Sequence, residues 1–332
     1  MERVRGCLIC GVSEQLPLLS FRPDAYRRML SSCANERVRF VVCRECSFIY
    51  QSPRFTTEEL KAVYGEEARK ETVGADGIPR PSYLEFTRTK SQLEFEWLRP
   101  RLPQGGGGRV LEVGCATGQL LRHFKDEGWR AVGVEPSRAF ADYGSRVHDL
   151  PIVPALFEET ELEPEFDLVI MSQVLEHVLD PEQVLTRAAS LLTPTGRIYV
   201  SVPYYPARLT ARPARELFIS VHLHIFSSIS LANLASHCKL SVETEGATGI
   251  YLRAILRPQP TAVPRLDRED PRAVRRRVLA AALRYFVVHE SYFLLAQAIK
   301  RRLVSVLGET RGPRAVEAVR RLKQKLPMRM RR

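Results

Sequence analysis

Two hydrophobic patterns alternate through the middle of this chain. Short apolar runs rich in β-branched residues are followed by stretches with an apolar residue at every third or fourth position. The first pattern predicts buried β-strands, and the second predicts amphipathic helices. Strands are predicted at 109–114, 130–136, 166–173 and 196–203, with another near 150–157, and helices between them at 119–128, 137–147 and 181–192. Because such alternation produces a parallel sheet covered on both faces, we predict an α/β, doubly wound domain.

The segments on either side of this alternation follow other patterns. One helix is predicted at 83–102, before the first strand, and another at 228–240. The stretch 241–257 favours a pair of strands that closes the sheet. Pro and Arg residues at 257–272 mark the start of a further helical segment. The pattern therefore predicts one α/β domain with an extension at each end.

The net charge of +12 is concentrated near the C-terminal end. Residues 265–332 contain 19 Lys and Arg against 6 Asp and Glu, whereas residues 1–264 contain 31 against 32. Any affinity for a polyanion or an anionic membrane surface therefore belongs to this basic tail. No run of eighteen or more uncharged apolar residues occurs, and MERVRGCLICG lacks the apolar segment of a signal peptide. These features predict a soluble, cytoplasmic protein without a transmembrane segment.

The stretch VLEVGCATGQLL at 110–121 ends a predicted strand in small residues and then continues as a helix. Gly114 and Gly118 have no Cβ, so the backbone N–H groups of this turn can approach a ligand closely. A dinucleotide-binding turn carries further glycines at the positions that Ala116 and Gln119 occupy here. The turn therefore argues against a pyrophosphate ligand.

Two acidic residues refine the choice of ligand. Glu135 ends the next predicted strand, where a carboxylate accepts hydrogen bonds from two ribose hydroxyls. Glu112 lies on the first strand, two residues before Gly114, and its charge would repel a diphosphate and attract an ammonium or sulfonium group. The pattern indicates an adenosine ligand that carries a positive charge.

At these positions the chain resembles the class I S-adenosylmethionine-dependent methyltransferases. The resemblance rests on four segments in the family's order and spacing, namely VLEVGCATG, GVEPS, FDLVIMSQVLEHVLDP and LLTPTGRIYVSVP. It covers roughly residues 80–250. It implies a Rossmann-like seven-stranded sheet whose last strand is antiparallel, and S-adenosylmethionine as the cofactor.

The resemblance also implies roles for individual residues. Glu135 would hold the ribose diol, Glu112 would organise water or the amino group, and Ser172 and Gln173 would border the methyl group. The backbone of the glycine turn would line the methionine and ribose end. The implied cofactor-binding residues are Glu112, Gly114, Cys115, Gly118, Glu135, Ser172 and Gln173.

Two CxxC pairs lie in the N-terminal region, Cys7 with Cys10 and Cys43 with Cys46. In a chain without an export signal they indicate reduced thiols or metal ligands. Each pair can occupy two corners of a tetrahedral Zn²⁺ site, and the 32 residues between the pairs are compatible with a zinc ribbon that holds an inserted loop. Four cysteine ligands leave no position for a catalytic water, so we predict a structural metal. The segment FVVCRECSFIYQSPRFTTEELKAVYG also resembles the N-terminal zinc-binding module of several bacterial sugar C-methyltransferases.

Histidines supply the candidate catalytic bases. His222 and His224 alternate in the extended segment VHLHIFS, so we expect them to point the same way. This segment resembles the motif in which a Glu-His pair is the base of sugar C-methyltransferases; His222 matches the histidine, and Val221 replaces the glutamate. An O-methyltransferase could use His222 as well, and a structural histidine is the alternative. His177, in LEHV, is expected to support the site.

Together these features predict an S-adenosylmethionine-dependent methyltransferase acting on carbon or oxygen of a small-molecule acceptor, such as a nucleotide-sugar or another biosynthetic intermediate. The predicted regions are a zinc-binding module at 1–65, a helical linker region at 66–108, the S-adenosylmethionine-binding domain at 109–257 and a basic helical C-terminal extension at 258–332.

Two alternatives stay open. One is a zinc-ribbon nucleic-acid-binding or RNA-modifying methyltransferase, and the other is a non-catalytic scaffold with the methyltransferase fold. No aromatic-rich RNA-binding motif accompanies the basic tail, so a nucleic-acid partner is not expected. For the tail itself, packing on the body or on another subunit is favoured over weak contact with an anionic membrane surface.

Overall fold

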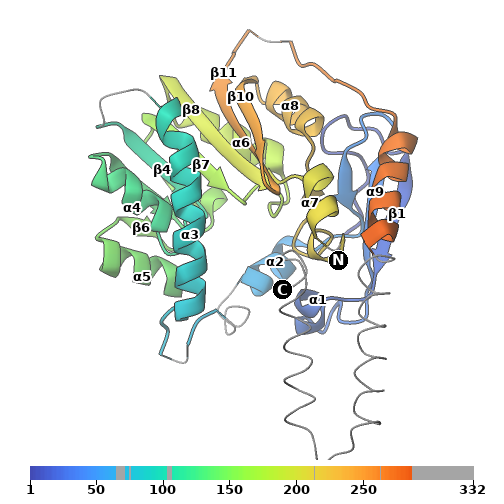
Figure 1. Cartoon of the computed structure of the whole chain (residues 1–332), viewed down its shortest axis with the longest axis horizontal. Coiled ribbons are helices and arrows are strands. Elements are labelled where there is room, and N and C mark those ends of the chain that lie inside the picture. Colours follow the sequence, from blue (N-terminus) through green and yellow to red (C-terminus); the bar gives the residue numbers. More distant parts are fainter. Residues whose placement is uncertain (65–71, 75, 103–106, 213, 262, 286–332) are drawn as a thin grey trace, which may run out of the picture. The chain divides into compact units, whose positions relative to one another are not determined.

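Two β-sheets organise the chain (Figure 1). The computed structural model describes residues 1–64, 72–74, 76–102, 107–212, 214–261 and 263–285. The chain divides into two units, Met1–Leu279 and Ala280–Arg332, and only 280–285 of the second are described. The predicted helices and basic residues beyond Tyr285 therefore lie outside the described residues, as does part of the predicted linker region.

The larger sheet has seven strands, as the resemblance implied. In spatial order they are β10 (Leu240–Thr248), β11 (Tyr251–Pro258), β8 (Leu192–Pro203), β7 (Phe166–Ser172), β4 (Arg109–Val113), β5 (Arg130–Val134) and β6 (Ile152–Val153). Only β11, the last strand along the chain, runs antiparallel to its neighbours. The predicted α/β, seven-stranded fold is thus confirmed. The strand expected near 150–157 is only two residues long.

Helices cover both faces of this sheet (Figure 1). Because side chains alternate along a strand, Val110 points to one face and Leu111 to the other. The helices packed with Val110 are α3 (Pro81–Leu98), α4 (Gln119–Asp126) and α5 (Arg138–His148). Those packed with Leu111 are α6 (Pro181–Ser190) and α8 (Ser228–His237). Both faces are therefore buried, which explains the nearly continuous apolar runs of the central strands.

A second, four-stranded sheet is built mainly from the N-terminal region. Its order is β1 (Gln15–Phe21), β2 (Val38–Cys43), β3 (Ile49–Gln51) and β9 (His224–Ile225), and the helices α1 (Ala25–Met29) and α2 (Thr57–Tyr64) accompany it. The pairing of β9 with β3 was not predicted from the sequence. Strand β9 belongs to the segment between β8 and α8, so this part of the chain adds to the N-terminal sheet.

A buried arginine joins the same two segments. Arg27, on α1, is fully buried; its Nε donates to Ser220 Oγ at 3.1 Å, and its Nη2 donates to Gln51 Oε1 at 2.7 Å. The backbone N–H of Gln51 in turn donates to the carbonyl oxygen of Leu223 at 2.9 Å. These bonds fix the segment around 217–226 to the N-terminal sheet, and this segment carries both predicted catalytic histidines.

The remaining described helices are short connections and the start of the tail. Helix α7 (Tyr205–Ala211) follows β8, and α9 (Pro271–Tyr285) begins the C-terminal region. Before α9 the chain contacts the cysteine-bearing module, where Ser47 Oγ donates to the carbonyl oxygen of Glu269 at 2.7 Å. Among the described residues, no helix combines the length and apolarity needed to cross a membrane.

Candidate active site

The turn between β4 and α4 lies at the carboxyl edge of the large sheet. Gly114 and Gly118 have φ angles of 66° and 70°, in the left-handed region that favours glycine. A Cβ at Gly114 would lie 3.0 Å from Cγ2 of Val174, and one at Gly118 would lie 2.9 Å from Cδ1 of Leu150. The N–H of Gly114 donates to the carbonyl oxygen of Val134 at 2.8 Å. The turn is therefore held against β5 by backbone bonds, and its glycines cannot be replaced without strain.

Glu135, at the end of β5, is held by the same turn. Its carboxylate accepts the backbone N–H of Ala116 and that of Ser137, each at 2.9 Å, and the side chain is buried. Because β4 and β5 are parallel neighbours, their carboxyl ends meet at one edge. The structure thus brings together the predicted ribose-binding acid and the glycine turn.

Glu112, on β4, is a buried carboxyl group. Its Oε2 has no hydrogen-bond partner in the described part of the chain. Burial raises the pKa of Glu112 well above its ordinary value, and Lys90 on α3 opposes that shift. A buried polar atom without a partner costs about 1–3 kcal/mol, so its persistence calls for a ligand.

Glu112 is one of several such groups along the same edge. Thr117 follows β4, Ser137 follows β5, and Ser172 ends β7. The hydroxyl oxygens of these three residues are also buried without a hydrogen-bond partner among the described residues. A row of unsatisfied donors and acceptors beside a glycine turn suits a polar ligand that completes their bonds. These residues therefore fit an adenosyl cofactor with an ammonium group, as the sequence predicted.

The other predicted cofactor residues contribute differently. Gln173 has a φ of 62°, and its Nε2 donates to the carbonyl oxygen of Ser201 on β8 at 3.1 Å. The Cys115 side chain is buried, and its Sγ occupies the space beside Gly133. Burial raises the pKa of the Cys115 thiol well above its ordinary value. The buried Cys115 side chain is therefore not suited to contact a ligand, and the role predicted for its backbone stays a prediction.

Two histidines named from the sequence, His177 and His222, lie together with a carboxyl group that the sequence reasoning missed. Glu176 is buried. One of its carboxyl oxygens, a ring nitrogen of His177 and a ring nitrogen of His222 lie within 4.8 Å of one another. The His177 Nδ1 lies 2.8 Å from the carbonyl oxygen of Val221, and the rings of His177 and His222 have centroids 4.9 Å apart. Glu176 interrupts the apolar run VLEHVL, which is the one sequence signal that could have identified it.

His224 does not join this cluster, so the expectation that the two histidines point the same way is wrong. The His224 ring is fully buried and stacks on Phe48 with centroids 5.7 Å apart. Its Nε2 lies 2.9 Å from the carbonyl oxygen of Val178, and burial lowers its pKa to about 3. His224 therefore packs against Phe48 beside β3, whereas His222 lies beside Glu176.

The four predicted metal ligands also lie together. Cys7, Cys10, Cys43 and Cys46 place their sulfurs within 4.8 Å of one another, and the Cys7–Cys46 and Cys10–Cys43 distances are 3.5 Å. A tetrahedral Zn²⁺ site with Zn–S bonds of about 2.3 Å separates its sulfurs by about 3.8 Å. The arrangement fits a structural zinc ion, and Cys33 lies apart from it.

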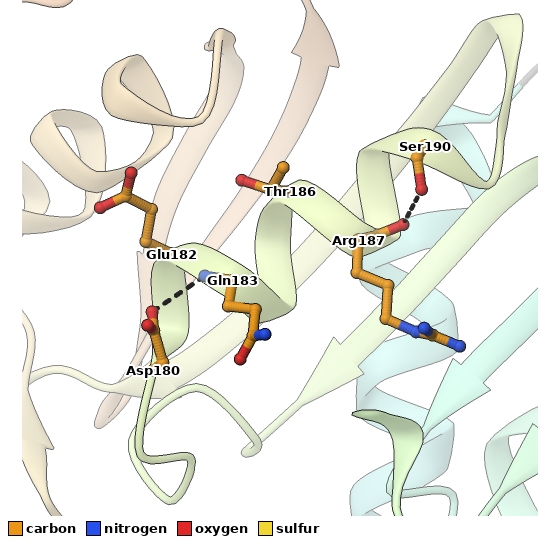
Figure 2. A pocket seen from close by; sticks show the side chains of 6 residues that line it. All are labelled: Asp180, Glu182, Gln183, Thr186, Arg187 and Ser190. Carbon is orange, nitrogen blue, oxygen red and sulfur yellow. Dashed lines mark hydrogen bonds between the residues drawn. The ribbon is translucent and has the colours of Figure 1, made fainter. Parts of the chain in front are cut away.

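A separate hollow lies along α6, on the surface (Figure 2). It has a volume of about 440 Å³ and is lined by Asp180, Glu182, Gln183, Thr186, Arg187 and Ser190. Asp180 caps the helix by accepting the N–H of Gln183, and Ser190 Oγ donates to the carbonyl oxygen of Arg187. Bonds within the helix thus use these groups, and no predicted site residue lines this hollow.

The family comparison matches the part of the chain that carries this site. Residues 85–245 match the family model described as a methyltransferase domain. Ubiquinone biosynthesis O-methyltransferases from Rhodopseudomonas palustris strain TIE-1 and Bradyrhizobium diazoefficiens are 31% and 33% identical over 128 and 126 residues. Each alignment covers 36% of this chain and 50% of the relative. The chain therefore spans about half the length of the curated relatives it matches.

Among solved structures, the chain is similar to an S-adenosylmethionine-dependent methyltransferase from Mesorhizobium loti. The TM-score is 0.43 at 18% identity, and the match covers 49% of this chain and 97% of that one.

Proposed function

We propose that this chain, whose residues 85–245 form a methyltransferase domain, transfers a methyl group from S-adenosylmethionine to a hydroxyl group of a small-molecule acceptor. The names of the relatives, which are O-methyltransferases of ubiquinone biosynthesis, support oxygen as the acceptor atom. A nucleotide-sugar or another hydroxyl-bearing biosynthetic intermediate fits this chemistry. Which acceptor is used is determined by the loops beyond the carboxyl edge of the sheet.

Different residues of the chain hold different groups of the cofactor. The Glu135 carboxylate accepts hydrogen bonds from the two ribose hydroxyls, while the N–H groups of Ala116 and Ser137 hold the carboxylate in place. The unpaired carboxyl of Glu112 accepts from the amino group, and the Ser172 hydroxyl borders the methyl group. When bound, the cofactor supplies an electrophilic methyl on a positively charged sulfur. Alignment of the acceptor oxygen with that methyl is then the main catalytic contribution.

One observation carries this proposal, namely the row of unpaired buried polar atoms at the carboxyl ends of β4, β5 and β7. The row follows the glycine turn, where backbone and ligand can approach closely. In a protein that bound nothing there, each of these atoms would cost about 1–3 kcal/mol.

The proposal is tested by following conversion of S-adenosylmethionine to its demethylated product. The purified chain is incubated with hydroxyl-bearing acceptors of three kinds: phenols, nucleotide-sugars and lipid-linked intermediates. We expect product with at least one kind. Tight cofactor binding without turnover on any of them would instead favour a non-catalytic scaffold.

We also propose that Cys7, Cys10, Cys43 and Cys46 hold a structural Zn²⁺ ion, which is supported by the mutual approach of their sulfurs. Metal analysis of freshly purified protein should give one zinc per chain. Cys43→Ser should abolish zinc retention, whereas the control Cys33→Ser, outside the cluster, should keep it. A content well below one zinc per chain in the unaltered protein would contradict this assignment.

A further inference from the structure

Glu176, in the loop after β7, lies beside two imidazole rings, those of His177 and His222. Glu176 is 1% exposed, and neither of its oxygens has a hydrogen-bond partner within the described residues. The His177 Nε2 lies 3.7 Å from Glu176 Oε1, beyond hydrogen-bond range. A ring nitrogen of His222 lies within 4.8 Å of a ring nitrogen of His177 and of a carboxyl oxygen of Glu176. Three groups that can receive a proton therefore converge.

Both rings are oriented so that they add acceptors to this cluster. The Nδ1 of His177 lies 2.8 Å from the carbonyl oxygen of Val221, and that of His222 lies 2.6 Å from the carbonyl oxygen of Leu217. Because a carbonyl oxygen only accepts, each Nδ1 carries the hydrogen, and the Nε2 of a neutral ring carries a lone pair. Each ring therefore offers Glu176 an acceptor rather than a donor.

We propose that Glu176 takes the proton of the acceptor hydroxyl during methyl transfer, and that the positively charged cofactor is what ionises Glu176 beforehand. This inference rests on the proposed function. It adds a catalytic residue to the site and couples the charge of that residue to the charge of the cofactor.

The position of Glu176 suits this role. Strands β4 and β7 are parallel neighbours, with Val113 opposite Met171, so the loop after β7 begins at the edge that carries the glycine turn. Val174, in that loop, lies against Gly114. The carbonyl oxygen of Glu176 accepts the N–H of Leu223 at 2.7 Å, which fixes the residue to the segment that carries His222. Glu176 therefore lies between the glycine turn and the segment that carries His222.

The charges around Glu176 explain why a positively charged cofactor can ionise its carboxyl group. Burial raises its pKa to about 8, so the carboxyl is mostly protonated near pH 7 before a ligand binds. Its own backbone amide, and then Lys90 on α3 and Arg208 on α7, oppose this shift without removing it. The other titratable groups facing it are His177, His222 and, on β11, Tyr251. An additional nearby cation lowers the pKa of a carboxyl group by about 1–3, enough to ionise Glu176.

The resulting step balances in charge. The acceptor oxygen bonds to the methyl carbon while the carbon–sulfur bond breaks and its electron pair stays on sulfur. The hydroxyl proton passes to the Glu176 carboxylate. Before the step the site holds one positive sulfur and one carboxylate, and afterwards it holds a neutral thioether and a neutral carboxyl. No net charge is created in a buried site, where an unpaired charge is costly.

The test counts protons released when ligands bind. Calorimetry of the full chain at pH 7, in two buffers of different ionisation enthalpy, is performed with S-adenosylmethionine and with its demethylated product. Both ligands carry the same amino and carboxyl groups, so their difference isolates the sulfur charge. We expect S-adenosylmethionine to release up to about one more proton per chain. Equal proton counts would overturn the inference while leaving the proposed function intact; no binding of either ligand would overturn both.

Two variants assign the released proton to a residue. In Glu176→Gln the difference between the ligands should vanish, which separates Glu176 from His177 and His222. In the matched control Glu163→Gln, an exposed position, it should persist. A difference that persists in Glu176→Gln would overturn the assignment. Binding of Mg²⁺ to the unaltered chain, but not to Glu176→Gln, would also overturn the assignment. In that case Mg²⁺, and not the cofactor, would ionise Glu176.

Discussion

Glu135 and Glu176 lie beyond the same edge of the sheet in opposite surroundings. Two backbone N–H groups fix Glu135, whereas Glu176 receives no hydrogen bond from any described residue and lies beside two imidazole rings. A carboxylate held by backbone donors is suited to bind hydroxyl groups in one geometry. A carboxyl without donors is suited to exchange a proton. The difference teaches that binding and proton transfer are assigned to separate carboxyl groups.

The strongest way to break this comparison is to remove the exchangeable proton. Glu176→Gln keeps the shape of the side chain but cannot accept a proton, so kcat should fall by about 10²-fold or more. The affinity for the demethylated product should stay within about threefold, because that ligand carries no sulfur charge. Steady-state kinetics and calorimetry measure the two quantities. A kcat close to that of Glu163→Gln would contradict the assignment.

The complementary change removes the binding carboxylate. Glu135→Ala should raise the Kd for S-adenosylmethionine about 10- to 100-fold, since hydrogen bonds to a charged group contribute about 1.5–3 kcal/mol. At saturating cofactor, kcat should change much less. If kcat fell as strongly as in Glu176→Gln while Kd stayed constant, the separation of roles would be wrong.

A pair of histidine variants separates a role in proton transfer from a role in stability. His222→Ala should lower kcat roughly tenfold, because the ring beside Glu176 helps to hold the transferred proton. His224→Ala should instead lower the free energy of unfolding by about 2–3 kcal/mol, because it removes a fully buried ring stacked on Phe48. Turnover and urea denaturation distinguish the two. Loss of turnover in His222→Ala without loss in Glu176→Gln would make His222 the base.

A last expected effect is on stability against pH. The folded-state pKa of Glu176, about 8, lies above its ordinary 4.5, so its contribution to stability is complete below pH 4.5 and is lost as the pH rises toward 8. Glu176→Gln removes this titration. The stability of the variant relative to the unaltered chain should therefore rise by at most about 1.4 kcal/mol per pH unit in that range. Urea denaturation at pH 5.5 and 7.5 checks this, and a constant difference would contradict it.

The cofactor side was predictable because its residues are close in sequence. Gly114, Gly118 and Glu135 lie on one strand–turn–helix–strand unit, and parallel pairing of β4 with β5 brings its ends together. The seven-stranded sheet followed from the same alternation, supported by the resemblance. Periodicity was weaker in the N-terminal region, where β1 to β3 were not assigned individually.

The acceptor side was less predictable because distant segments assemble it. Lys90, Glu176, Arg208 and His222 come from four separate parts of the chain, and no local pattern joins them. Alternation in VHLHIFS made His222 and His224 look equivalent. The pairing of His224 with Tyr50 turns its ring toward Phe48, and only a long-range contact determines that.

The central claim is that the glycine turn and the unpaired groups around it receive an adenosyl cofactor with a positive charge. Calorimetric titration of the full chain with S-adenosylmethionine and with NAD⁺ tests it most directly. The account predicts saturable binding of S-adenosylmethionine at one site per chain and no binding of NAD⁺. Clear binding of NAD⁺ with no heat from S-adenosylmethionine or its demethylated product would contradict it.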